Sequence, residues 1–285
     1  MAHEVKVSGA VHPIKYGETK VGGVVQKIKY GETKIGGVVQ KISFDGGEVD
    51  DIKEFADTPW SEIVKICRGI SEGGEIPETW DVGATHKLKI YDSEKDANAD
   101  DGNLNYTEYD VEIIGFEHDS GEDWISGVTL QLSDCFDGLR TMDYGGEDNL
   151  LYAQHYGETQ IFYDMENIFR RIEKDVRENI VPVLKFCESS AGGGVELYAK
   201  LFLLSENEVF GNSPTDKISQ QYQHYRVGGS TEKNYNGSPY EWWLRSKGRV
   251  GSNISNSRFG CVEKDGSFAS KVDIERFGVS FAFCL

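Results

Sequence analysis

The segment that decides the fold is Trp242–Leu285, which reads WWLRSKGRVGSNISNSRFGCVEKDGSFASKVDIERFGVSFAFCL. It opens with three apolar residues and closes with a second apolar run. Because side chains alternate between the two faces of a strand, at least one of Trp242 and Trp243 is expected in the core. The two ends therefore predict scaffold strands, Trp242–Arg245 and Gly278–Leu285, with polar loops between them.

The charged residue Arg245 stands inside the first of these apolar runs. A guanidinium buried there needs a carboxylate partner, because an unpaired buried charge is costly. The segment LLSENEVFG offers Glu206 and Glu208 as partners. The sequence predicts a structural ion pair with one of them.

The residues upstream predict a mixture of helix and strand. Thr58 and Pro59 have the chemistry of an N-cap and a first helical residue, and the apolar residues that follow recur at helical spacing up to Gly73-Gly74. Over the last hundred residues, Gly, Ser and Asn interrupt the apolar runs, which predicts irregular structure. The further predicted elements are strands at His86–Tyr91, Tyr109–Phe116, Val128–Leu132 and Lys200–Leu204, and a helix at Asp164–Ile180.

A tandem repeat marks the front of the chain. Lys15–Ile28 and Lys29–Ile42 differ only at Val21 and Ile35, and KVSGAVHPI at Lys6–Ile14 has the pattern of a degenerate third copy. Each unit holds a β-prone run and a glycine pair. A unit of this length cannot bury a core alone. Two interpretations stay open: a flexible spacer or solenoid edge, and a β-structured shaft formed by three chains.

Charge also separates two segments, and we expect repeats over residues 1–43 and one globular domain over residues 44–285. Residues 1–44 carry seven Lys and three Glu, whereas the whole chain has a net charge of −18. Such an acidic chain repels nucleic acids and anionic membranes. With neither a secretory signal nor a long apolar run, the protein is expected to be made in a cytoplasm without membrane insertion.

Neither the cysteines nor the acidic loop predicts a metal or a cofactor. The five cysteines are widely spaced without a C-x-x-C pair, which favours buried free thiols. The loop at residues 92–108 partly matches a calcium-binding loop, but Ala97 and Ala99 occupy positions that need oxygen ligands. A solvated hairpin loop is therefore favoured over a calcium site.

The pair His118-Asp119 has the composition of a general base. Adjacent strand residues point apart, however, and no nucleophile is placed nearby by the sequence. A structural role is expected, and no catalytic residue is assigned.

Six motifs in order carry a family resemblance: WSEIVKICRGI, TWDVGATHKLKI, VEIIGFEHD, KLFLLSENEVFG, EWWLRS and GVSFAFCL. From about residue 58 to 285 the chain resembles a domain family of gut bacteria and their phages that carries a W-W-L-R-S motif. That family is similar in fold to C-type lectins and formylglycine-generating enzymes, and to the variable proteins of diversity-generating retroelements. One departure is Lys247, where the family often has proline.

The resemblance implies an α+β, C-type-lectin-like domain whose variable region, at about residues 247–276, binds a ligand. It implies a virion protein of a phage or prophage that binds a host cell-surface protein or glycan. The repeats would hold it in a homotrimer and attach it to other virion proteins. The expected ligand-binding residues are Arg249, Asn253, Ser255, Asn256, Arg258, Phe259, Glu263, Lys264, Phe268, Ser270, Lys271, Asp273, Glu275 and Arg276, supported by Trp242, Trp243, Arg245 and Glu206.

Two alternatives stay open. One is a decoration protein of the virion. The other, less favoured, is an enzyme of the formylglycine-generating type, which would use Cys261 and Cys284. These two cysteines do not form that family's closely spaced pair.

Overall fold

The computed structural model describes residues 53–98, 104–121, 124–143 and 153–285, together with short strands in the N-terminal segment. The chain separates into two compact units, Met1–Ile52 and Lys53–Leu285, and each is described by itself. The boundary predicted between residues 43 and 44 coincides with the end of the last N-terminal strand at Ser43, whereas the second compact unit begins at Lys53.

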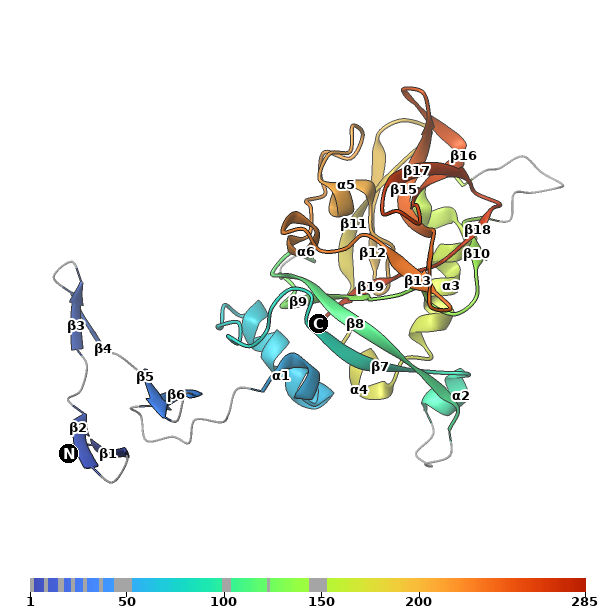
Figure 1. Ribbon diagram of the computed structural model, residues 1–285. Helices are drawn as coiled ribbons and strands as arrows, with labels where there is room; N and C mark the ends of the chain where they lie inside the picture. The colour runs from blue at the N-terminus through green and yellow to red at the C-terminus, as the bar shows by residue number, and fades with distance from the viewer. Residues whose placement is uncertain are drawn as a thin grey trace. The chain divides into compact units, whose positions relative to one another are not determined.

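The first unit contains antiparallel β-hairpins that follow the sequence repeat (Figure 1). In the two near-identical copies, a strand lies on each side of the glycine pair, so that Val21 is opposite Val24 and Ile35 is opposite Val38. Each copy thus forms two strands where the sequence predicted one short β-prone run. The strands are β1 His3–Val7, β2 Ala10–Ile14, β3 Glu18–Val21, β4 Val24–Lys27, β5 Tyr30–Ile35 and β6 Val38–Ser43.

The second unit begins with a short 3-10 helix, Phe55–Asp57, and the helix α1, Trp60–Ser71. The predicted cap is wrong by one residue, because Pro59 is the N-cap and the Thr58 hydroxyl donates to the Glu54 carbonyl at 2.8 Å. The predicted apolar face is confirmed, and its buried members are Trp60, Ile63, Cys67 and Ile70.

A four-stranded antiparallel sheet forms the body of this unit, in the order β19-β9-β8-β7. Its strands are β7 Thr85–Tyr91, β8 Tyr106–Phe116, β9 Val128–Leu132 and β19 Ala282–Cys284. The three strands predicted in this region are confirmed, with β8 starting three residues early. The end of the chain completes the sheet, because Phe283 pairs with Leu130.

The prediction of one continuous helix over Asp164–Ile180 is wrong, because the structure has two shorter helices in this region. The structure has α3, Gln160–Phe169, and a separate α4, Lys174–Arg177. Between them the chain turns toward β7. The Tyr91 amide donates to the Arg171 carbonyl at 2.9 Å, and Ile172 forms a bridge with Ile90. These tertiary bonds replace the helical bonds that the apolar spacing predicts.

The predicted strand Lys200–Leu204 is also wrong. The strands lie before it, as the hairpin of β11, Val183–Glu188, and β12, Gly194–Ala199. The predicted segment is buried over Leu201–Leu204 and makes a single bridge, in which Phe202 and Ala282 exchange both backbone bonds.

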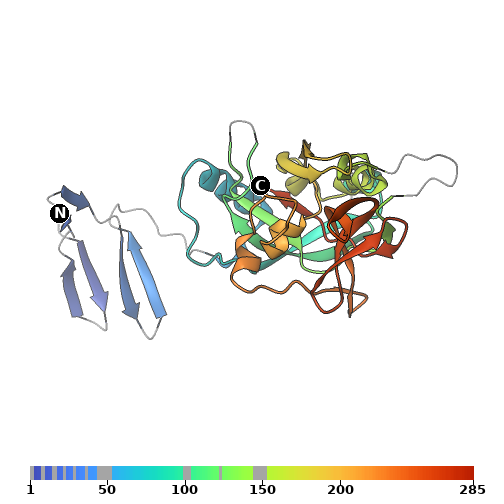
Figure 2. The ribbon, with the colours of Figure 1, turned by 90° about the horizontal axis from the view of Figure 1, so that it is seen from above.

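The last hundred residues are more regular than the sequence predicts. A three-stranded antiparallel sheet is formed by β15 Trp242–Val250, β16 Asn253–Val262 and β17 Phe268–Val272. Figures 1 and 2 both place this sheet away from α1 in the second unit. The smaller elements are α2 Glu94–Ala97, β10 Arg140–Thr141, the 3-10 helix Tyr156–Glu158, α5 Glu206–Phe210, α6 Gln223–Arg226, β13 Lys233–Tyr235, β14 Ser238–Tyr240 and β18 Arg276–Phe277.

The architecture is α+β, with antiparallel sheets and separate helices. No helix in the described ranges is both long and apolar enough to cross a membrane.

Candidate functional site

The predicted binding region is the sheet β15–β17, and its inner end is anchored in the core. Trp243 joins one buried apolar cluster and Trp242 joins another, as alternation along a strand requires. Their indole N–H groups donate to the carbonyls of Arg140 at 2.8 Å and Thr231 at 3.0 Å. The core role predicted for at least one tryptophan is confirmed for both.

The buried Arg245 has the predicted carboxylate partner, and it is Glu208. Arg245 Nη2 donates to Glu208 Oε1 at 2.8 Å, and Nη1 donates to Glu208 Oε2. Glu208 is held by a capping box with Ser205 at the start of α5. Burial alone would raise the pKa of Glu208, but Arg245 and Lys185 outweigh it and lower the pKa to about 2.

Glu206, the other carboxylate expected as a partner of Arg245, binds Arg249 instead. The two guanidinium nitrogens of Arg249 donate to the Glu206 carboxylate at 2.8 and 2.7 Å. Arg249 was expected to contact a ligand, yet its side chain is only 15% exposed. This bidentate pair fixes Arg249 as part of the support of the sheet.

A second buried cation, Lys185 on β11, extends the ionic cluster. Lys185 Nζ donates to Asp119, to Glu208 Oε1 at 3.1 Å and to the Tyr222 hydroxyl at 2.8 Å. Asp119 also accepts from the hydroxyls of Tyr222 and Thr129, both at 2.7 Å. Burial alone would raise the pKa of Asp119, but Lys185 holds it well below its usual value.

The enzyme-like pair His118-Asp119 belongs to this cluster. Contrary to the strand argument, the two residues follow the end of β8, and His118 Nδ1 lies 3.5 Å from Asp119 Oδ1. The His118 ring stacks on Tyr222 with the ring centroids 3.9 Å apart. The carboxylate of Asp119 accepts hydrogen bonds from the buried side chains of Lys185, Tyr222 and Thr129. These bonds give Asp119 a structural role.

Five of the expected binding residues are exposed. Asn253 and Asn256 lie at the outer end of the sheet, Lys264 lies in the turn between β16 and β17 at the opposite end, Glu275 follows β17, and Arg276 lies in β18. Six others are partly exposed: Ser255, Arg258, Glu263, Phe268, Ser270 and Lys271. Some of these are held by neighbours, since Arg258 Nη1 donates to the Ser270 carbonyl at 2.7 Å and Lys271 pairs with Glu263 at 2.8 Å.

Two expected binding residues are buried, and their assignment to the surface is wrong. Phe259 is fully buried beside Trp243 in the core, and Asp273 is 1% exposed. The burial of Phe259 follows from its place in the central strand β16, where it pairs with Lys247 of β15 and with Lys271 of β17.

The departure from the family pattern, Lys247, is a buried cation under the sheet. Its ammonium donates to the carbonyls of Ala153 at 2.9 Å and Asn256 at 2.8 Å, and it lies 4.0 Å from the centroid of the Phe259 ring. Burial lowers its pKa to about 8. Among the residues that the structure describes, the two buried carboxylate oxygens of Asp273 have no hydrogen-bond partner, and burial raises the pKa of that carboxyl.

Two surface residues were missed by the sequence reasoning. Val250 and Ile274 are 64% and 56% exposed, beside the exposed polar residues of the same sheet. The sequence carries no signal that identifies them, because single apolar residues are common on protein surfaces.

No group of three or more metal-binding side chains occurs in the residues that the structure describes. Ala97 ends the short helix α2, while residues 99–103 of the acidic loop lie outside the described ranges. All five cysteines are free and buried, as predicted. Burial raises the pKa of Cys261 to about 12 and raises that of Cys284 well above its usual value, which opposes thiolate formation at neutral pH.

Comparison with known proteins places the chain in a family. No curated protein and no solved structure matches it significantly. One family matches residues 126–285, which include two of the four strands of the sheet, β9 and β19, the ion pairs of Arg245 and Arg249, and the whole of β15–β17. Since this match covers more than half of the chain, the protein belongs to the family described as Domain of unknown function (DUF6273).

Proposed function

We propose that this chain is a receptor-binding or attachment protein of a phage or prophage. Its second unit would be a C-type-lectin-like head, of the kind that diversity-generating retroelements vary. The ligand would be a protein or glycan on the host cell surface, and it would bind to the exposed side chains of β15–β17.

The observation that carries the proposal is the division of this one sheet into a buried and an exposed end. Residues 242–248 of β15 are buried in succession, whereas Val250 and Asn253 at the turn are exposed. Arg245 and Arg249 of this strand form ion pairs with Glu208 and Glu206 of α5, which fix the strand to that helix. Side chains at the exposed end can therefore change without disturbing the core, as a variable binding surface on a rigid support requires.

The chemistry of the exposed end suits recognition of a macromolecule. Val250 and Ile274 offer apolar contact, while Asn253 and Asn256 offer adaptable hydrogen bonding. In the proposal, the N-terminal hairpins join three chains and attach them to other virion proteins. Several weakly binding heads would then give a high avidity.

A cell-binding assay tests this function. A display variant would replace Asn253, Asn256, Lys264, Glu275 and Arg276 by alanine in the full chain. A matched control would replace the exposed charged residues Lys65, Glu72, Lys174 and Glu178, which lie on or beside α1 and α4. Labelled proteins are measured by flow cytometry on a panel of gut bacteria and on a glycan array. We expect the display variant to lose the binding that the control keeps; equal binding by both variants would exclude this surface.

A decoration protein and a diversified binding protein also differ in their genes. If the head is diversified, substitutions between copies of this gene in related genomes will cluster at adenines in codons 247–276. An even spread of substitutions along the gene would contradict diversification and favour the decoration alternative. For the enzyme alternative, the buried thiols of Cys261 and Cys284 would have to ionise, and their raised pKa values count against it.

A further inference from the structure

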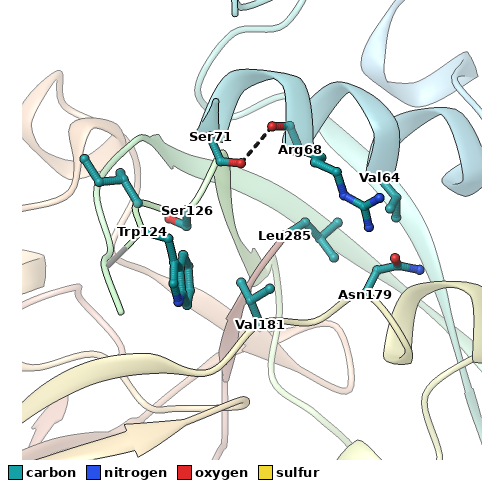
Figure 3. Close-up of a pocket in the computed structure, with 9 residues that line it drawn as sticks. Val64, Arg68, Ser71, Trp124, Ser126, Asn179, Val181 and Leu285 are labelled. Carbon is teal, nitrogen blue, oxygen red and sulfur yellow. Dashed lines mark hydrogen bonds between the residues drawn. The ribbon is translucent and has the colours of Figure 1, made fainter. Parts of the chain in front are cut away.

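A pocket lies apart from the β15–β17 surface, between α1 and Leu285 (Figure 3). Residues of α1, the segment Trp124–Ser126, Asn179 and Val181 after α4, and Leu285 line it. Its volume is about 230 Å³. This is below the ~300–1,000 Å³ typical of sites for drug-sized ligands, so the pocket suits a small molecule.

One side of the pocket is apolar. Figure 3 shows Trp124 and Val181 facing the interior on one side of Leu285, and Ile125, which also lines the pocket, is 48% exposed. Apolar surface left in water costs about 25 cal/mol per Å². A ligand with an apolar tail would cover this surface.

The opposite side carries a cation and an amide. Figure 3 shows the guanidinium of Arg68 and the side-chain amide of Asn179 across Leu285 from Trp124. Arg68 is exposed and has no ion-pair partner within the described ranges, unlike the buried Arg245 and the partly buried Arg249. Asn179 is fixed by donation from its Nδ2 to the Asp175 carbonyl at 2.8 Å.

We infer that this pocket binds a small monocarboxylate with an apolar tail, such as a medium-chain fatty acid. The carboxylate would pair with the Arg68 guanidinium, whose planar donors match it in a bidentate manner. The tail would lie against Trp124 and Val181. Because the chain has 48 acidic and 30 basic residues, a free anion is repelled by the protein as a whole. Binding therefore needs both the local cation and the apolar contact.

Titration of the full-length protein with octanoate, octanol and octylamine tests the inference. Calorimetry should show saturable binding of octanoate, at least tenfold tighter than that of octanol, with octylamine weaker still. Arg68→Gln should weaken octanoate about tenfold and leave octanol unchanged. Arg226→Gln, on the exposed surface of α6, should leave both unchanged.

Several results would overturn the inference. These are the absence of saturable octanoate binding, equal affinities for octanoate and octanol, or equal effects of Arg68→Gln and Arg226→Gln. The display variant described above serves as a separate control, since it should bind octanoate like the wild type. A failure of this pocket and a failure of the host-binding proposal are thus distinguishable.

Discussion

The buried carboxylate Glu208 offers the sharpest test of how the sheet β15–β17 is supported. Glu208→Gln keeps the size of the side chain and removes its charge. The change leaves Arg245 without a charged partner and leaves Lys185 with Asp119 alone. All of these groups are at least 95% buried, so solvent cannot replace the lost charge.

The magnitude follows from the ionisation of the group. A carboxyl whose pKa falls from 4.5 to about 2 on folding contributes about 3 kcal/mol at neutral pH. Loss of one partner from a buried ion pair costs a similar ~3–5 kcal/mol. We therefore expect Glu208→Gln to lower the free energy of unfolding by about 3 kcal/mol at pH 7.

Urea denaturation followed by tryptophan fluorescence measures this change. The matched control is Glu263→Gln, since Glu263 pairs with Lys271 at the surface and its side chain is 37% exposed. An exposed pair contributes only ~0–1 kcal/mol. The pH dependence is a second arm. Because the pKa of Glu208 is lowered, its contribution is complete above pH 4.5 and is lost as the pH falls toward 2.

The difference between wild type and Glu208→Gln should therefore shrink over that acidic interval. A loss no greater than that of Glu263→Gln, or a difference that does not depend on pH between 4.5 and 2, would refute the reasoning.

Three further predictions concern the same unit. Phe259→Ala should lower the free energy of unfolding by ~3–5 kcal/mol in urea denaturation, whereas Lys264→Ala should lower it by less than about 0.5 kcal/mol, because only Phe259 is buried. Similar losses for the two variants would contradict the assignment of Phe259 to the core and Lys264 to the surface. Because the pKa of Lys247 is lowered to about 8, the stability of the wild type should rise with pH between 8 and 10.5, measured as a change in urea midpoint. Lys247→Met should lack that rise. Parallel pH profiles of the two proteins would show that Lys247 is not the cause of the rise. The five buried thiols, four of them with pKa values raised to about 12, should resist a thiol reagent in the native protein and react in urea, and rapid native labelling would contradict their burial.

Sequence reasoning succeeded where neighbours along the chain decide the outcome. The face of α1 and the strands β7, β8 and β9 follow from the spacing of apolar residues, and both tryptophans of WWLRS lie in the core. It failed where a distant segment competes for the backbone. The helix predicted across Arg171 is broken because that residue bonds to Tyr91 on β7.

The candidate site shows the same contrast. That Arg245 needs a carboxylate follows from its place in an apolar run, but Glu206 and Glu208 are two residues apart and equally acidic. Only the direction of α5 decides between them, because its capping box turns Glu208 toward Arg245 and leaves Glu206 to Arg249.

The sequence by itself determined the repeat, the burial of the cysteines, the apolar frame of the last segment and the need for a buried ion pair. These features depend on residue type and on spacing over a few residues. The tertiary structure alone decided which side chains of Trp242–Leu285 face water. Asp273 is buried and Val250 and Ile274 are exposed, although residue type predicts a polar surface and an apolar core, and Phe259 is buried although the family resemblance implied a surface position. The reason is that strand pairing and the packing of distant segments fix the direction of each side chain, and neither is encoded in local spacing.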